Sequence, residues 1–190
     1  PVKSAWDAGS IPAICWHWNV PDGKGGYGTG KDMPFDPAKI LVSGTEENKI
    51  ALADVAEMAE SLKKLQDAGI AVLFRPFHEA AGDYTWGAWF WWGKDGVDTT
   101  KALWKWLYNT LTNDYKLNNL VWVWTMQASD EGKLAAVSKL RAAYPGDECV
   151  DIVGADLYEP SYSDQSAKFN LLTSAVEGHK MVALAETGNL

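Results

Sequence analysis

Two glutamates follow short apolar runs, and their placement indicates acid–base chemistry. The run 70–74 ends close to Glu79, and the run 181–185 ends at Glu186. Short apolar runs of this kind are typical of strands buried on both faces of a parallel sheet. Pro76 cannot donate a hydrogen bond to a neighbouring strand, so the first strand should end there and leave Glu79 just beyond it. Two carboxylates delivered to one rim of a barrel are the pair that cleaves a glycosidic bond, and this is our hypothesis for the chain.

The apolar runs recur along the chain at spacings that suit repeated strand–helix units. The predicted strands are 11–15, 70–75, 120–124, 150–158 and 181–185, and the predicted helices are 2–9, 45–68, 99–117, 133–144 and 164–178. Thr45 is the expected N-cap of the second helix, and Thr99 or Thr100 is that of the third.

This pattern predicts the α/β class, and specifically an incomplete (β/α)8 TIM barrel. A complete barrel has eight strands and takes about 250 residues, whereas this chain has 190 residues and the five strands predicted above. We therefore expect residues 1–190 to form one catalytic domain that is a barrel segment, without strands before Ile11 and after Glu186. Its two open edges and apolar interior should make it poorly soluble unless further chain or a partner covers them.

The composition argues against several classes of partner. Seventeen Lys and Arg against 25 Asp and Glu give a net charge of −8, and no run of five basic residues occurs, so we expect no binding to nucleic acid or to an anionic membrane. No stretch approaches the roughly 20 apolar residues of a membrane span. No signal peptide opens the chain, and because it starts at Pro1, the N-terminus looks cut. A neutral polysaccharide suits this charge balance.

The sequence gives little support to metal or nucleotide chemistry. His78-Glu79 begins like the helical zinc motif, but Gly82 stands where that motif needs its second histidine. The letters of 25–31 imitate a phosphate-binding loop, yet Asp32 replaces the Ser or Thr that holds magnesium. We predict neither a metal nor a cofactor.

The two cysteines do not indicate a disulfide. Cys15 lies near the end of one predicted strand and Cys149 at the start of another, so a parallel sheet would hold them at opposite ends. We expect free, buried thiols that serve packing alone.

Several segments carry a family likeness in the expected order. They are Trp16-His17-Trp18-Asn19, 75–79, 89–93, 118–124, and 144–147 leading into Asp156-Leu157-Tyr158. Together they resemble glycoside hydrolase family 26 of clan A, which consists mostly of β-mannanases on the eight-stranded barrel. The resemblance covers nearly the whole chain and assigns these segments to strands three to seven, which agrees with the strand count.

The resemblance implies a retaining endo-hydrolase that cleaves β-1,4-mannosidic linkages in mannan, glucomannan or galactomannan. Glu79 would be the acid/base and Glu186 the nucleophile. Glu79 must then start protonated, so its pKa should be raised by apolar surroundings and by the charge of Glu186. Glu186 must stay ionised, and therefore needs hydrogen-bond donors.

The resemblance also implies a set of sugar contacts around the two glutamates. Tyr158 resembles a tyrosine that donates to the nucleophile, and Trp89 an aromatic platform beside the acid/base. An insertion at 83–88 blurs this alignment, so Trp86 could hold the platform position instead. Asp156 is expected to be a structural, hydrogen-bonding residue of the site. The full set of predicted substrate contacts is His17, His78, Trp89, Tyr158, Arg75, Trp124 and Trp86.

Two alternatives stay open at this point. The same family includes some β-glucanases and xylanases, and the choice of sugar depends on contacts that spacing does not reveal. A non-catalytic carbohydrate-binding barrel fragment would use the same tryptophans. In each case the expected partner is a polysaccharide, with the complete protein a monomer. By resemblance it is secreted or on the bacterial cell surface.

Overall fold

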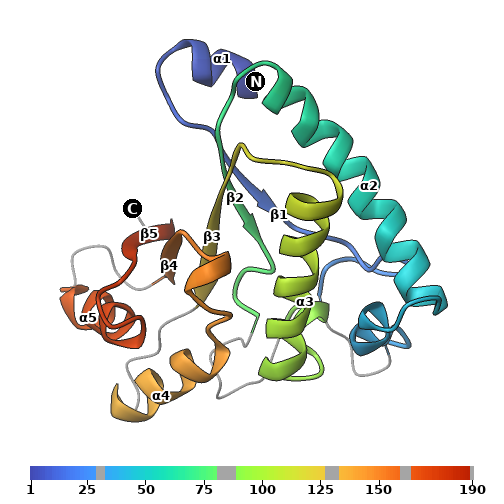
Figure 1. Cartoon of the computed structure of the whole chain (residues 1–190). Helices are drawn as coiled ribbons and strands as arrows, with labels where there is room; N and C mark the ends of the chain where they lie inside the picture. Colours follow the sequence, from blue (N-terminus) through green and yellow to red (C-terminus); the bar gives the residue numbers. More distant parts are fainter. Residues whose placement is uncertain (29–32, 81–88, 127–132, 159–163, 189–190) are drawn as a thin grey trace.

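The fold is a parallel sheet of five strands, seen here in a computed structural model that describes residues 1–28, 33–80, 89–126, 133–158 and 164–188. The strands are β1 (Ala13–Trp16), β2 (Val72–Pro76), β3 (Leu120–Met126), β4 (Ile152–Leu157) and β5 (Met181–Thr187). They lie side by side in chain order, and β1 and β5 are the two edges, so the sheet is open (Figure 1). This confirms the predicted segment of an α/β barrel.

Helices connect the strands and cover the outer side of the sheet (Figure 1). They are α1 (Val2–Asp7), α2 (Glu46–Asp67), α3 (Val97–Asn109), α4 (Lys133–Ala143) and α5 (Ser166–Ala175), with shorter helical turns η1 (Pro37–Leu41), η2 (Trp91–Gly93), η3 (Thr110–Asp114) and η4 (Asp147–Cys149). The predicted cap of α2 is confirmed, because the Thr45 side chain accepts a hydrogen bond from the backbone N–H of Asn48.

The predicted N-cap of α3 is wrong. The helix begins at Val97 and is preceded by Gly96, which has a φ of +87°. Thr100 lies inside the first turn, where it is buried and its hydroxyl donates to the carbonyl of Trp92. The hydroxyl therefore joins α3 to η2 and does not cap the helix.

The main core lies between the sheet and its helices. Phe74 of β2 packs edge-on against Trp122 of β3, with ring centroids 5.4 Å apart, and Trp122 in turn meets Trp104 of α3 at 5.7 Å. All three rings are at most 3% exposed. This packing fixes which side of each strand faces the helices, so the alternate residues face the barrel interior.

The barrel interior is less completely filled than the outer core. A cavity of about 250 Å³ is bordered by residues of all five strands, among them Cys15, Leu73, Val123 and Ala183. On β5, the side chain of Met181, which shares a face with Ala183, is exposed. The expectation of an open apolar interior is therefore confirmed, and its effect on solubility stays a prediction.

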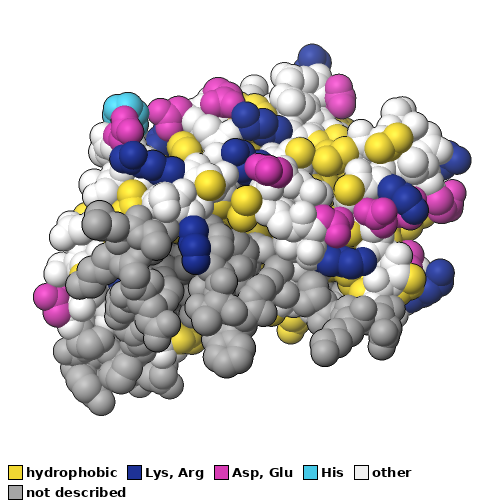
Figure 2. Space-filling view, turned by 90° about the horizontal axis from the view of Figure 1, so that it is seen from below, with side chains coloured by type: hydrophobic (Ala, Val, Ile, Leu, Met, Phe, Trp, Pro, Cys, Tyr) yellow, Lys and Arg dark blue, Asp and Glu magenta, His cyan; other side chains and the backbone are white. Residues whose placement is uncertain are grey.

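Both cysteines are free, as predicted. Cys149 is buried just before β4, whereas Cys15 is only partly buried at the carboxyl end of β1. Among the described residues, none of the helices is long and apolar enough to cross a membrane. In the face shown in Figure 2, acidic and basic side chains of the described residues are interspersed and do not form a single basic patch.

Gly154 lets three strands approach one another below the rim of the sheet. A Cβ atom at this position would lie 2.4 Å from Cγ2 of Thr125 on β3 and 2.9 Å from Cβ of Ala185 on β5. Real side chains do not come this close, so any residue larger than glycine must push the strands apart or displace Thr125.

We therefore expect Gly154→Ala to lower the free energy of unfolding by about 1–3 kcal/mol, the usual cost of overpacking a core. Denaturant or thermal unfolding of the two chains measures this difference. Gly26→Ala is the matched control, because its added Cβ would have only one neighbour within 4 Å, Oδ1 of Asn19 at 4.0 Å, and its cost should stay within about 0.5 kcal/mol. Equal stability of Gly154→Ala and the unsubstituted chain would contradict the packing argument.

Candidate active site

Two strands deliver a glutamate to the same end of the sheet. β2 ends at Pro76, as predicted, and Glu79 follows three residues later; it is 7% exposed. Glu186 lies near the end of β5, and its side chain is 26% exposed. Because all five strands are parallel, both residues lie at the carboxyl ends of the strands, which is where barrel enzymes hold their reactive groups.

A β-bulge turns Glu186 toward the barrel interior. Ala155 of β4 pairs with Leu184, but the next residue, Asp156, pairs with Glu186, so Ala185 is one extra residue in β5. If β5 kept all its residues but alternated strictly, Glu186 would lie on the opposite face from Ala183. The bulge instead places Glu186 on the same face as Asp156, and bulges are common next to active sites for this reason.

Glu186 accepts hydrogen bonds at both carboxylate oxygens. Arg75 Nη2 donates to Oε1 in an ion pair, and the Tyr158 hydroxyl donates to Oε2. The ring of Tyr158 lies against Gly188, where an added Cβ would come within 2.5 Å of the ring. The prediction that Glu186 has donors is confirmed, and these donors favour its ionised form.

Arg75 holds several acceptors of the site in fixed positions. Its Nη1 donates to Asp156 Oδ2 at 2.8 Å and to Thr125 Oγ1 at 3.1 Å, while Nη2 bonds to Glu186. The residue is 7% exposed and Asp156 is fully buried. The role of Arg75 as a sugar contact stays a prediction; its guanidinium is engaged by three protein oxygens, one of which belongs to Glu186.

The backbone that carries Glu79 is strained. Phe77 and Glu79 both have a φ of +49°, a left-handed conformation that residues with a side chain seldom adopt. Such residues typically cost about 1–3 kcal/mol each and cluster at functional sites. The Glu79 backbone N–H donates to the Thr125 carbonyl at 3.2 Å, which fixes the turn against β3. The strain aims the Glu79 side chain toward Asp156 and Trp89, the two side chains it interacts with.

The surroundings of Glu79 favour its protonated form. Burial, followed by the charge of Asp156, raises its pKa to about 7, although a hydrogen bond from Trp89 Nε1 to Oε2, at 2.9 Å, partly opposes this. The predicted direction is confirmed, but the second cause is the charge of Asp156 and not that of Glu186. Oε1 of Glu79 and Oδ1 of Asp156 are both buried, and neither has a hydrogen-bond partner among the residues that the structure describes. A proton on Glu79 that is shared with Asp156 satisfies both oxygens.

His78 and His17 line the side of the site nearest β1. The two rings are 4.3 Å apart between centroids, with His78 buried and His17 exposed. Burial and the charge of Arg75 lower the pKa of both, in His78 to about 3. His78 is therefore a neutral imidazole. The structure brings both predicted sugar contacts to the group that contains Glu79.

The predicted aromatic contacts have different outcomes. Trp89 lies beside Glu79 and bonds to it, whereas Trp86 is outside the described residues. Trp124 is 3% exposed and packs against Tyr144, with ring centroids 5.4 Å apart. It shares the helix-facing side of β3 with Trp122, because residues two apart in a strand point the same way. Its assignment as a sugar contact is corrected: it is a core residue.

The two indoles of η2, those of Trp91 and Trp92, support the site from the side of the core. Trp92 is fully buried, donates from Nε1 to the His78 carbonyl at 3.0 Å, and packs against Phe90 with ring centroids 4.5 Å apart. Trp91 is also fully buried and donates to the Trp18 carbonyl at 2.7 Å. These residues fix the backbone around His78 and leave their rings in the core.

A comparison of the sequence with protein-family models shows to which family the chain belongs. The model of "Glycosyl hydrolase family 26" matches residues 2–190. The chain belongs to this family.

Individual relatives and solved structures agree with this. A mannan endo-1,4-beta-mannosidase of Thermothelomyces thermophilus is 37% identical over 96% of this chain, and one of Bacillus subtilis is 35% identical over 85% of it. The crystal structure of a beta-mannanase from a symbiotic protist of the termite Reticulitermes speratus, complexed with gluco-manno-oligosaccharide, superposes with a TM-score of 0.86 at 40% identity. The GH26 domain of a Prevotella bryantii endo-beta-mannanase/endo-beta-glucanase gives the same two values.

The match covers this chain almost completely but its family-26 relatives only in part. The chain spans 36% and 44% of the two curated relatives, and 55% and 60% of the two crystallised chains. The open sheet thus corresponds to roughly half of the closed barrels that it superposes on.

Two members of the site were assigned only a passive role from the sequence. Asp156 was expected to be structural, yet its charge acts on Glu79, and Cys15 was expected to be inert, yet its Sγ lies 3.4 Å from Nδ1 of His78. The sequence did contain a signal that Asp156 belongs to the site. An arginine and an aspartate that are buried in otherwise apolar strands are expected to pair with each other.

The raised pKa of Glu79 can be measured directly. We expect the side-chain carboxyl carbon of Glu79 to titrate by NMR with a midpoint near pH 7. Trp89→Phe removes the N–H that favours the carboxylate, so the midpoint should move to higher pH. Trp106→Phe on α3 is the matched control and should leave it in place. A midpoint near the ordinary value for glutamate, or a downward shift in Trp89→Phe, would contradict this account.

Proposed function

We propose that the protein hydrolyses β-1,4-mannosidic linkages within mannan, glucomannan or galactomannan by a retaining mechanism. The observation that carries the proposal is the contrast between the two glutamates. Glu79 is buried with a pKa raised to about 7, whereas Glu186 accepts from Arg75 and Tyr158. Two carboxyl groups whose environments drive them to opposite protonation states divide into an acid and a nucleophile.

In the first step, Glu186 attacks the anomeric carbon while Glu79 protonates the leaving glycosidic oxygen. The bond between the two sugars breaks, and the glycone becomes an ester of Glu186. In the second step, Glu79, now a carboxylate, takes a proton from water, whose oxygen displaces Glu186 and restores both groups. A retaining enzyme needs the two carboxyl groups about 5–5.5 Å apart. Two glutamates on one rim and one interior face, linked through Arg75 and Asp156, support this.

The neighbours of the two glutamates have specific tasks in this mechanism. Arg75 and Tyr158 hold the Glu186 carboxylate still and release it without reorganisation as it becomes an ester. Burial raises the pKa of Asp156 and the neighbouring Arg75 opposes this rise, while the negative charge of Asp156 in turn helps Glu79 to keep its proton until transfer. Trp89 offers an indole plane to the apolar face of a sugar, and His17 and His78 offer neutral ring nitrogens to its hydroxyls.

The choice of mannan is supported by the names of the relatives. Those reported above are mannan endo-1,4-beta-mannosidases, and one crystallised relative holds a gluco-manno-oligosaccharide. We propose that the complete protein acts outside the cell, where such a polymer is found, and that it works as a monomer. A β-glucanase or xylanase would use the same two glutamates, and product analysis on mannan, β-glucan and xylan separates these activities.

The function is tested with the full-length protein on mannan. Glu79→Gln and Glu186→Gln should each lower kcat by at least about 10²-fold, because each removes a group that takes part in bond cleavage. Glu177→Gln, an exposed glutamate at the end of α5, is the matched control and should keep full activity. NMR of the first product should show retention at the anomeric carbon. Wild-type turnover in either of the first two variants would eliminate the mechanism.

A second candidate, a carbohydrate-binding segment without catalysis, follows from the partial coverage of the relatives. It predicts that this chain binds manno-oligosaccharides but releases no products. Calorimetry of oligosaccharide binding alongside the product assay distinguishes the two functions.

A further inference from the structure

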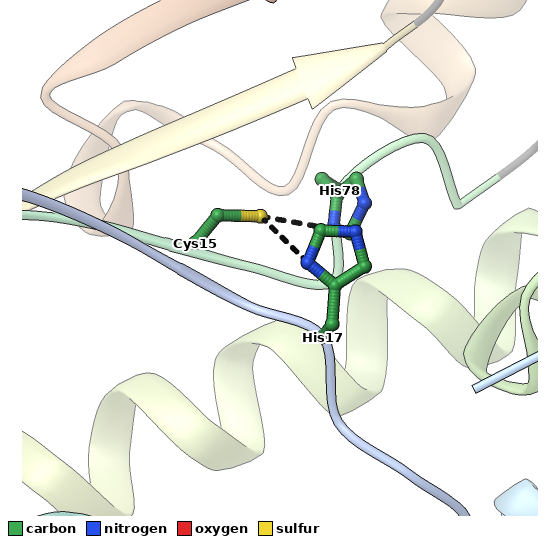
Figure 3. A group of neighbouring side chains, drawn as sticks. All are labelled: Cys15, His17 and His78. Atoms are coloured by element: carbon green, nitrogen blue, oxygen red, sulfur yellow. Dashed lines mark hydrogen bonds between the residues drawn. The ribbon is translucent and has the colours of Figure 1, made fainter. Parts of the chain in front are cut away.

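Three side chains with metal-binding atoms meet at the carboxyl ends of β1 and β2. Cys15 Sγ lies 3.4 Å from Nδ1 of His78 and 3.7 Å from Nδ1 of His17. One potential ligand atom from each of the three residues lies within 4.8 Å of the other two. Figure 3 shows the sulfur directed at both imidazoles, which come from two different chain segments. The proposed hydrolysis makes no use of the thiol.

The spacing of these atoms fits a tetrahedral metal ion. Bonds of about 2.3 Å from zinc to sulfur and about 2.05 Å to nitrogen, at the tetrahedral angle, place sulfur and nitrogen about 3.6 Å apart. The two observed separations, 3.4 and 3.7 Å, lie on either side of this value.

The fold already fixes the positions of two of the three residues, Cys15 and His78. Cys15 is in register with Arg75 across β1 and β2, and the backbone of His78 is fixed by the hydrogen bond from Trp92. The His78 ring also lies 4.6 Å from that of Phe90, between centroids. A preorganised set of ligands binds a metal without the cost of ordering the chain.

We propose that Cys15, His17 and His78 form a binding site for a thiophilic divalent cation such as Zn²⁺. Binding replaces the S–H bond by a bond from metal to sulfur and releases one proton to solvent, while each histidine donates a ring-nitrogen lone pair. Three protein ligands leave the fourth position open to water or to a sugar hydroxyl. A thiolate and two imidazoles select zinc or copper over calcium and magnesium.

The charges around the cluster allow a cation there. The nearest positive group is Arg75, which is close enough to act electrostatically on Cys15 and on both histidines. Its charge is opposed by two carboxylates that bind it, those of Asp156 and Glu186. The charged groups around the ligands are therefore acidic on balance once the arginine is paired.

The cation would compete with carbohydrate. This step rests on the proposed function, in which His17 and His78 contact the sugar and Glu79 follows His78 directly. A bound metal ion would occupy Nδ1 of each ring and place a positive charge at the edge of the substrate site. Zinc is therefore an inhibitor of hydrolysis and not a cofactor.

The site is tested first by binding to the chain itself. Titration with Co²⁺ should give the thiolate-to-cobalt charge-transfer absorption, with saturation at one ion per chain, and Zn²⁺ should abolish it. Cys15→Ser should lose the absorption, and His17→Ala, at an exposed position, should weaken affinity more than the roughly 10- to 100-fold typical of losing a supporting outer group. Absence of the absorption, or its survival in Cys15→Ser, would overturn the site.

The chain supplies a matched set of controls. It contains two cysteines and three histidines, so Cys149→Ser and His179→Asn alter the cysteine and the histidine outside the cluster. Both variants should bind cobalt as the unsubstituted chain does. If they weaken binding as much as the cluster variants, the metal is held elsewhere and the proposal is wrong.

A second measurement separates this proposal from the proposed function. In the full-length protein, the ratio of mannan hydrolysis with and without Zn²⁺ should fall well below one, return to one with a chelator, and stay near one in Cys15→Ser. Hydrolysis that is insensitive to Zn²⁺, in a protein that binds no cobalt, would overturn the cation site alone. Cobalt binding in a protein that does not cleave mannan would overturn only the hydrolysis.

Discussion

The buried ion pairs of Arg75 are the constraint on which the rest of the site depends. A guanidinium in the interior of a sheet is tolerated only when its donors are matched, and here Asp156, Glu186 and Thr125 supply the acceptors. These partners come from β3, β4 and β5, whereas Arg75 belongs to β2. One side chain thus links four of the five strands at the end where the chemistry takes place.

This link also separates the two glutamates electrostatically. Arg75 stabilises the charge of Glu186 by direct contact and that of Asp156 beside it. Asp156 in turn makes a second negative charge on Glu79 unfavourable. The protonation states needed for catalysis therefore follow from the arrangement of four ionisable groups across the sheet, which are Glu186, Arg75, Asp156 and Glu79. Burial strengthens the electrostatic interactions among these groups, because little water is present to screen their charges.

Much of the fold was predictable from the sequence, because buried parallel strands give a strong local signal. Each predicted strand overlaps an observed one, and Pro76 ends β2 as its missing N–H requires. The positions of Glu79 and Glu186 followed from the same logic. The side of β3 on which Trp124 lies was misjudged. When both faces of a strand are buried, apolar residues do not alternate with polar ones, so the sequence does not show which residues face the helices and which face the barrel interior. The protein partners of Arg75 could not be predicted because they are distant in sequence.

The left-handed backbone at Phe77 and Glu79 and the close contact at Gly154 depend on tertiary packing, and no local pattern encodes them. The cluster of Cys15, His17 and His78 was also hidden, since its members are brought together by the pairing of β1 with β2.

The face on which the Glu186 side chain lies depends on the bulge at Ala185 and not on which amino acid occupies position 186. If β5 paired regularly with β4 at its present length, Asp156 would pair with Ala185, and Glu186 would turn to the other face because side chains alternate along a strand. Replacements elsewhere in β4 or β5 that make this pairing regular would therefore disable such a barrel as a hydrolase while both glutamates stay in the sequence. Surveys of this fold for lost activity should accordingly examine the pairing of β4 with β5 as well as the presence of the glutamates.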